Sequence, residues 1–233
     1  DLGNRGPNSS LSYSSDEIED LIVLLTSEVE GTEYIVYPSQ LPQYLLLTEG
    51  KKVFKRTLTE ALTASKDHAS IIPVNVAKKI RKSHWIGLKI TYNSIDKLTD
   101  IFLYDSCRYS IPNLLGEVDD SDIELFLNNF DKILLTNHYF VTHRYAQKIV
   151  KLIFEIDDNQ ANDYRVIISK CVQKQNKRRD QGWFVVANLV ASTRNNLPLE
   201  DKHVLRKTHR DILNNANQDS DDFDEFLIKK ERY

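Results

Sequence analysis

The stretch from His84 to Ser106 reads HWIGLKITYNSIDKLTDIFLYDS and contains two runs rich in isoleucine and aromatic residues, at 85–92 and 100–104. Side chains of these types favour β-strands, because they pack well on a pleated surface. A histidine stands at the head of the first run, and Asp105 directly follows the second. Because side chains on neighbouring strands can lie side by side, this carboxylate could fix the tautomer of the imidazole and stabilise its charged form.

Helical patterns flank these strands on both sides. Ser14 or Ser15 can cap a helix whose first turn is acidic and whose apolar residues repeat on one face. A later helix begins with a capping box formed by Ser121 and Glu124. The remaining expected strands are 34–37, 70–75 and 164–172, and the expected helices are 16–29, 58–66, 121–135, 141–155, 182–192, 200–217 and 222–230. Helices at both ends of a central set of strands predict an α+β domain.

The composition is that of an ordinary soluble globular protein. The chain has 233 residues, enough for one substantial domain, with 41% hydrophobic and 28% charged residues. Its net charge of −3 gives no support to nucleic-acid binding through bulk positive charge. Methionine is absent and the chain starts at Asp1, so we expect either a piece of a larger protein, whose other domains could be partners, or a deliberately trimmed chain. Residues 1–13 predict a flexible lead-in without the apolar region of a signal peptide, and no apolar run reaches the roughly 20 residues of a membrane span.

Several kinds of site lack their sequence motifs. Neither a glycine-rich phosphate loop nor an H-E-x-x-H or paired C-x-x-C motif occurs. The pairs His138–His143 and His203–His209 could be forced into a ligand set, but histidines on the surface or on a helix face are the commoner explanation. We therefore expect no metal and no cofactor. Two cysteines are too few for a disulfide framework and favour a reducing compartment such as the cytosol.

A third segment, from Gln175 to Trp183, leads from a basic loop into an apolar helix. The start of a helix suits a thiol nucleophile, since the helix dipole and the unpaired N–H groups favour the thiolate there. The side-chain amide of Gln175 could donate a hydrogen bond to a developing oxyanion. Each residue taken singly fits ordinary turn, loop or core chemistry, but the order and the flanking elements together indicate an active-site frame.

Taken together, the segments resemble the Ulp1-like cysteine peptidases, a group that contains the SUMO proteases and bacterial effector deubiquitinases. The family pattern has His-Trp on one strand, Asp at the end of the next, and Gln-x5-Cys-Gly, usually with Asp before the Cys. The matching residues are His84, Trp85, Asp105, Gln175, Asp180 and Gly182. The resemblance covers about residues 70–195. It implies a papain-type cysteine protease fold, with a central mixed sheet flanked by helices.

The implied activity is cleavage after the C-terminal Gly-Gly of ubiquitin or a ubiquitin-like modifier by Cys-His-Asp chemistry. His84 and Asp105 would be catalytic, and Gln175 would serve the oxyanion. The nucleophile position, however, holds Gln181, and an amide can neither become a thiolate nor form a thioester. Removing the nucleophile removes nearly all of the rate of such a triad. We therefore expect that the chain does not hydrolyse peptide or isopeptide bonds. We expect Cys107 and Cys171 to be structural thiols.

The resemblance also implies a substrate-binding set and a domain layout. Trp85 would help to clamp the diglycine in a tunnel too narrow for side chains. Tyr34, Tyr37 or Tyr44 could replace the usual opposing tryptophan, which is absent. The full substrate-binding set is Trp85, Trp183, Asp180 and Gly182. The protease domain would span 14–199, with an inserted helical segment at 111–160 and a helical tail at 200–233. The insert and the N-terminal helix would be candidates for modifier recognition.

Four functions stay open from the sequence. They are a modifier protease whose nucleophile was replaced by engineering, a natural pseudo-protease that binds a partner without cleavage, an acetyltransferase of the same clan, and a pure interaction module. Ubiquitin leads as the partner, because the bacterial branch of the group mostly acts on it, although basic clusters at 78–82 and 174–179 would suit an acidic partner. The expected location is the cytoplasm, or the cytosol of a host cell if the chain is a bacterial effector.

Overall fold

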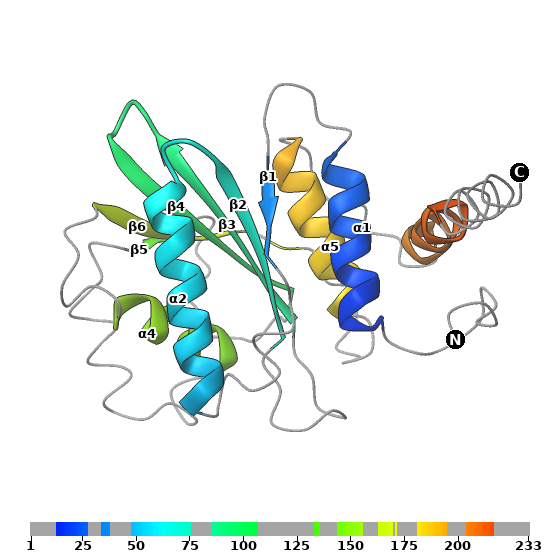
Figure 1. The fold of residues 1–233 in the computed structure, drawn as a ribbon, viewed down its shortest axis with the longest axis horizontal. Helices are drawn as coiled ribbons and strands as arrows, with labels where there is room; N and C mark the ends of the chain where they lie inside the picture. Colours follow the sequence, from blue (N-terminus) through cyan, green and yellow to red (C-terminus); the bar gives the residue numbers. More distant parts are fainter. Residues whose placement is uncertain are drawn as a thin grey trace, which may run out of the picture.

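The structure, a computed structural model, describes residues 13–27, 34–37, 48–75, 85–106, 133–135, 144–155, 163–169, 171, 181–194 and 204–216. Within these ranges, six strands form one sheet in the order β1-β2-β3-β4-β6-β5 (Figure 1). The strands are β1 (Tyr34–Val36), β2 (Ala69–Asn75), β3 (Trp85–Asn93), β4 (Leu98–Asp105), β5 (Ile133–Leu135) and β6 (Tyr164–Ile168). The helices are α1 (Ser15–Thr26), α2 (Thr48–Ala64), α4 (Arg144–Phe154) and α5 (Gln181–Thr193), and residues 204–216 form a further helix.

The sheet is mixed. Strand β3 pairs antiparallel with β2 and with β4, whereas β1 on β2, β6 on β4 and β5 on β6 are parallel pairs. The register sets Asn75 opposite Trp85 and Ile86 opposite Asp105. The start of β3 and the end of β4 therefore lie next to each other, as the sequence predicts.

The opposite end of the β3–β4 hairpin is closed by a polar network. The side-chain oxygen of Asn93 accepts hydrogen bonds from two backbone amides of the turn at 94–97, which is the usual way that asparagine starts a turn. Arg165 of β6 pairs with Asp100 at 2.6 Å and with Asp96 at 2.7 Å. This network ties β6 to β4 at the end of the sheet that is remote from Trp85.

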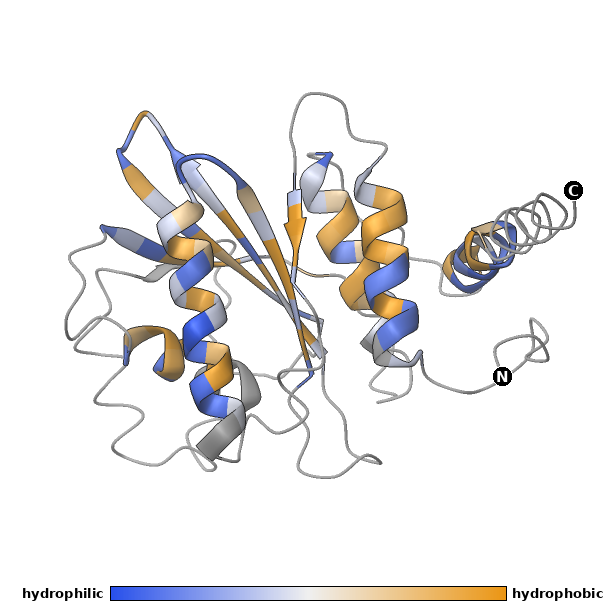
Figure 2. Ribbon diagram, viewed as in Figure 1, coloured by the Kyte–Doolittle hydropathy of each residue, from blue (hydrophilic) through white to orange (hydrophobic). Residues whose placement is uncertain are grey.

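Alternate residues of β3 face two separate hydrophobic cores. Ile86, Leu88 and Ile90 belong to a core shared with α2 and α4, whereas Trp85 belongs to a core shared with α1 and α5. Figure 1 shows α2 and α4 on one side of the sheet and α5 and α1 on the other. In Figure 2, α5 is a largely apolar helix, whereas α2 carries many hydrophilic residues. A helix that is apolar all round must be enclosed, and each residue of α5 in the range 182–189 is buried.

Three elements differ from the sequence-based prediction. Helix α2 begins at Thr48, well before the expected start at 58, because the buried Phe54 lies one turn before the buried Leu58 and extends the same face. The prediction of a helix at 121–135 is wrong at its end, because Ile133–Leu135 forms a strand that pairs with β6. The strand expected at 164–172 ends at Ile168. The capping box at Ser121, the helix at 222–230 and Cys107 lie outside the described residues.

Helix α1 begins with the cap that the sequence predicts, at the first of the two serines proposed. The hydroxyl oxygen of Ser14 accepts a hydrogen bond from the amide of Glu17 at 3.2 Å, and the Glu17 carboxylate accepts one from the Ser14 amide at 2.8 Å. This reciprocal pair is a capping box. Tyr13, at the boundary of the expected lead-in, is only 4% exposed and belongs to the same core as α1 and α5.

A buried histidine gives the fold a predictable response to acid. His209 lies in the helix at 204–216 and is 3% exposed. Burial and the neighbouring Arg210 lower the pKa of its imidazole to about 4, whereas an unfolded chain titrates near 6.5. Between these two values the unfolded state binds more protons, so the free energy of unfolding decreases as the pH falls, by up to about 3 kcal/mol.

In urea titrations from pH 7 to 4, His209→Gln should flatten this dependence of the free energy of unfolding on pH. The control His68→Gln, at an exposed site, should leave this pH dependence unchanged. Equal slopes of the free energy of unfolding against pH in the unaltered chain and both variants would show that His209 does not cause the dependence.

Candidate functional site

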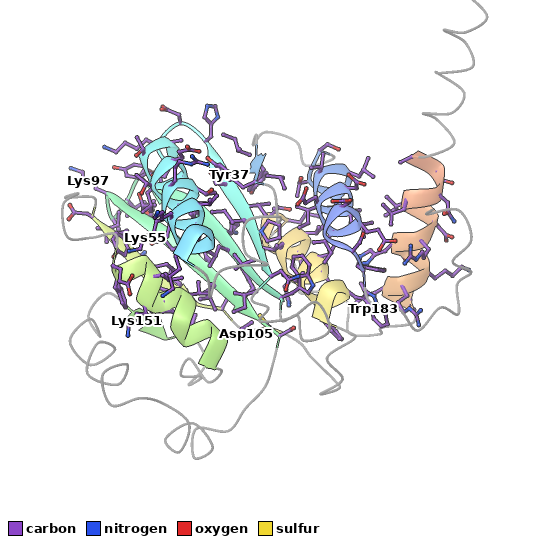
Figure 3. All side chains as sticks on the ribbon, turned by 60° about the horizontal axis from the view of Figure 1, so that its bottom comes forward. Tyr37, Lys55, Lys97, Asp105, Lys151 and Trp183 are labelled. Atoms are coloured by element: carbon purple, nitrogen blue, oxygen red, sulfur yellow. The ribbon has the colours of Figure 1, made fainter. Side chains whose placement is uncertain are left out.

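Three element ends meet at one end of the sheet. Trp85 opens β3, Asp105 closes β4, and Gln181 opens α5. Figure 1 shows the start of β3, the end of β4 and the start of α5 at the same end of the molecule. Figure 3 labels Asp105 at the end of its strand and Trp183 in the first turn of α5. The sequence predicts this meeting, and the backbone brings these three ends together.

Asp105 is half-buried and lies opposite Ile86 in the antiparallel register. Directly opposed residues of such a pair share one face of the sheet, and residues alternate between faces along each strand. Ser106 follows and is only 2% exposed, and its hydroxyl has no hydrogen-bond partner within the described part of the chain. A half-buried carboxylate at a strand end can orient a basic side chain that precedes the neighbouring strand.

The first turn of α5 fits closely against the N-terminal region. A side-chain carbon added at Gly182 would stand 3.2 Å from Cδ1 of Ile18 and 3.4 Å from Cβ of Tyr13. Glycine therefore lets α1 approach the start of α5. Trp183 is 3% exposed, and its ring lies 5.9 Å from the ring of Tyr13. The guanidinium of Arg206 stacks 4.4 Å from the centre of the same indole.

The middle of α5 is fixed to β3 by a glycine that sequence reasoning missed. A side-chain carbon added at Gly87 would stand 2.8 Å from both Cγ and Cδ2 of Leu189, so only glycine lets the helix cross the strand this closely. A glycine inside a strand often marks such a close approach. That signal is present in the run HWIGLKI, although it does not say which element approaches.

The far end of α5 is held by a lysine from the same strand. The Lys89 ammonium donates a hydrogen bond to the backbone oxygen of Ser192 at 2.8 Å and lies 4.8 Å from the ring centre of Phe102. Burial lowers the pKa of this amine. A cation at the C-terminus of a helix interacts favourably with the helix dipole. The N-terminus of α5, with the positive end of that dipole, is thereby aimed at the end of the sheet where Asp105 lies.

Two of the tyrosines proposed to oppose Trp85 are described by the structure. Tyr34 lies beside Ala69, at the far end of β2 from Asn75. Six residues of strand amount to roughly 20 Å, so Tyr34 is remote from Trp85. Tyr37 packs against the core shared with α2 and α4. Trp85 itself is 3% exposed and lies in the core with α5.

Other predicted site residues are not placed. His84, Gln175, Asp180 and Tyr44 lie outside the described residues, and so does the side chain of Gln181. Within the part of the chain that is described, no group of three or more His, Cys, Asp or Glu side chains could hold a metal ion. None of the helices in these same ranges has the length and apolar character to cross a membrane.

Comparisons with known proteins give matches among solved structures. No protein-family model and no curated protein matches the sequence. The Rickettsia bellii effector protein RickCE has a TM-score of 0.58 at 17% identity, over 88% of this chain and 95% of that chain. The Legionella pneumophila effector protein RavZ has a TM-score of 0.53 at 11% identity, over 86% of this chain and 63% of that chain. The protease domain of Ulp1, in complex with the yeast SUMO orthologue Smt3, has a TM-score of 0.48 at 14% identity, over 90% of this chain and 80% of that chain.

At these identities the likeness to RickCE and RavZ establishes the fold. The α+β fold class expected from the sequence is confirmed, since a central mixed sheet is flanked by helices and RickCE and RavZ share the fold. The likeness covers 95% of RickCE, so it is a likeness to nearly the whole of that chain.

Proposed function

We propose that this chain is a ubiquitin-like-modifier protease domain of the Ulp1-like type that binds the C-terminal Gly-Gly tail of its modifier without cleaving it, because Gln181 occupies the nucleophile position. The observation that carries the proposal is the meeting of three element ends. Strand β3 begins one residue after His84, β4 ends in Asp105, and α5 begins at Gln181. The order of these residues along the chain, with Gln175 before the helix, is that of the Ulp1-like pattern.

The proposed frame has a defined task for each group once a thiol stands at position 181. His84 takes the thiol proton and later gives it to the leaving amine, and Asp105 orients the imidazole and stabilises its charged form. The thiolate attacks the carbonyl carbon of the last glycine, the C–N bond breaks, and water then hydrolyses the thioester. The start of α5 and the Gln175 amide stabilise the oxyanion. The amide of Gln181 has no nucleophilic lone pair, so this sequence of steps cannot begin.

The diglycine tail would enter where β3 and α5 begin. Trp85 would form one wall of a tunnel that admits glycine and excludes larger side chains, and Asp180 and Gly182 would flank the entry to the helix. Trp183 belongs to the same implied set. Because its indole is enclosed by Tyr13 and Arg206, we assign it to the support of the helix start.

Ubiquitin is the first modifier to test, and the cytosol of a host cell is the proposed place of action. RickCE and RavZ are bacterial effector proteins with this fold, and we extend that setting to this chain. A protein that acts on a cytosolic modifier must itself reach the cytosol. A chain with only two cysteines has no disulfide framework, which agrees with such a reducing compartment.

Restoring the thiol tests the proposal. Gln181→Cys should cleave a fluorogenic C-terminal conjugate of ubiquitin, SUMO or NEDD8, whereas the unaltered chain and Gln181→Ser should release no fluorophore above background. A thiol at a helix N-terminus beside an imidazole is a strong nucleophile near neutral pH, so we expect an increase of at least 10³-fold over the unaltered chain, in line with the loss when a nucleophile is removed.

The other outcomes are equally informative. If the restored protein cleaves none of the three conjugates while the unaltered chain binds a modifier in calorimetry, the chain is a binding pseudo-protease. If it neither cleaves nor binds any of them, the proposed function is wrong. Transfer of an acetyl group from a thioester donor to a protein, without cleavage of any conjugate, would support the acetyltransferase alternative instead.

A further inference from the structure

The first turn of α5 is enclosed by two segments from opposite ends of the chain. One is Tyr13, and the other is the helix at 204–216. Figure 1 shows this last helix beside α1, on the side away from the sheet. Residues Phe184, Ala187 and Leu205 form a small buried cluster that joins the last helix to α5. Neither segment belongs to the part of the chain that carries the Ulp1-like sequence pattern.

Tyr13 is the centre of these contacts. It is 4% exposed, and its hydroxyl lies 3.1 Å from Nδ1 of His209. Its ring lies 5.9 Å from the ring of Trp183 and 5.2 Å from the guanidinium of Arg210. Its backbone nitrogen and Cβ lie 3.8 Å and 3.4 Å from the point that a side-chain carbon on Gly182 would occupy. Tyr13 therefore contacts both residues that follow position 181.

The helix at 204–216 is itself held by a nearly buried ion pair. Arg210 pairs with Glu17 at 2.6 Å, and the two side chains are 13% and 2% exposed. The second carboxylate oxygen of Glu17 accepts a hydrogen bond from the amide of Ser14. Both oxygens of this buried carboxylate thus have partners, as a buried charge requires. The capping box of α1, the ion pair and Tyr13 form one connected unit.

We propose that Tyr13, Glu17 and the helix at 204–216 form a positioning clamp that fixes the first turn of α5, and with it position 181, relative to Asp105. The proposal rests on the function proposed above, because it says how that site is held in register. The first turn of a helix lacks intrahelical partners for its N–H groups and opens easily. A displacement of about 1 Å at a nucleophile can lower the rate 10²-fold. Tyr13 is a positioning residue here, since it acts through Gly182 and Trp183.

Hydrogen exchange on the unaltered chain tests the clamp without any enzymatic activity. The amides of Val185 and Val186 bond to the carbonyls of residues 181 and 182 in a regular α-helix, so they report on the first turn. Tyr13→Ala should accelerate their exchange at least tenfold, whereas the amides of Val190 and Ala191 should change less than twofold. If Tyr13→Ala does not fold, Arg206→Ala should have the same local effect, because it removes a half-exposed side chain that stacks on Trp183.

The restored enzyme supplies the second readout. In the Gln181→Cys protein, Tyr13→Ala should lower kcat about 10²-fold with KM changed less than threefold, in line with a misplaced nucleophile. Tyr13→Phe keeps the ring and should retain most of kcat. The control is Leu58→Ala in α2, which removes a buried side chain from the other core and should leave both kcat and the exchange of Val185 unchanged.

The two proposals can fail separately. If the restored protein neither cleaves nor binds any modifier, the proposed function is wrong, and the exchange experiment alone decides the clamp. If Tyr13→Ala accelerates exchange evenly along α5, or if Leu58→Ala has the same effect on Val185, the contacts are general packing and the clamp is wrong.

Discussion

Replacing Asp105 by asparagine in the Gln181→Cys protein is expected to lower kcat/KM by roughly 10³–10⁴-fold, the loss seen when an acid that orients a catalytic histidine becomes an amide. Asp105 is the last residue of β4 and lies opposite Ile86, one residue from the start of β3. An amide of the same shape keeps the packing but cannot stabilise a charged imidazole. It also presents a donor where the imidazole needs an acceptor. The expected loss is in the chemical step rather than in folding.

The same strand supplies a matched control. Asp100 is also a carboxylate of β4, is 5% exposed, and pairs with Arg165 at the other end of the hairpin. Asp100→Asn removes a buried ion-pair partner and should lower the free energy of unfolding, but it should leave kcat/KM within threefold at temperatures where the protein is folded. Initial rates with a fluorogenic conjugate, measured from pH 5 to 9, separate the two. Equal losses for Asp105→Asn and Asp100→Asn would show that Asp105 is structural.

The second large effect is on stability. Gly87→Ala should lower the free energy of unfolding by about 1–3 kcal/mol, the cost of overpacking a dense core. The new carbon would stand 2.8 Å from Cγ and Cδ2 and 3.0 Å from Cδ1 of Leu189, whose side chain is fully buried. Either the leucine or the whole of α5 must move. Since α5 carries position 181 at its start, the restored enzyme should lose activity together with stability.

A double-mutant cycle identifies the cause of that loss. Leu189→Ala alone creates a cavity and should cost about 2–5 kcal/mol, but it removes the atoms that the new carbon would meet. Gly87→Ala combined with Leu189→Ala should therefore be less destabilising than the sum of the two, with a coupling of about 1 kcal/mol or more. Urea unfolding monitored by circular dichroism gives each value. Strictly additive losses would mean that the contact between Gly87 and Leu189 does not limit the approach of the helix.

The sequence predicts most of the strands and the helix that bears the site, because their signals are local. The run HWIGLKI and the apolar helix after residue 181 each carry a strong pattern of their own. The start of α2 is missed because its polar residues outnumber the buried ones in its first turns. The short strand β5 is missed because Ile133–Leu135 reads equally well as the end of a helix. Its partner, β6, lies far along the chain.

The parts of the site that sequence reasoning misses depend on contacts between distant segments. Gly87 is recognisable as a glycine inside a strand, but its partner Leu189 is known only once α5 crosses β3. The sequence predicts that Tyr13 ends a flexible lead-in, whereas the contact of its hydroxyl with His209 joins the two ends of the described chain. Neither pairing has a spacing or motif that a single sequence could reveal.

The most direct test of the central claim is to map where a modifier with an electrophilic C-terminus becomes attached. The unaltered chain and the Gln181→Cys protein are each incubated with ubiquitin, SUMO and NEDD8 that carry such a group, and the adduct is located by peptide mass spectrometry. We expect an adduct at position 181 of the substituted protein and none on the unaltered chain. An adduct on Cys107 or Cys171 of the unaltered chain, or a substituted protein that reacts with none of the three, would contradict it.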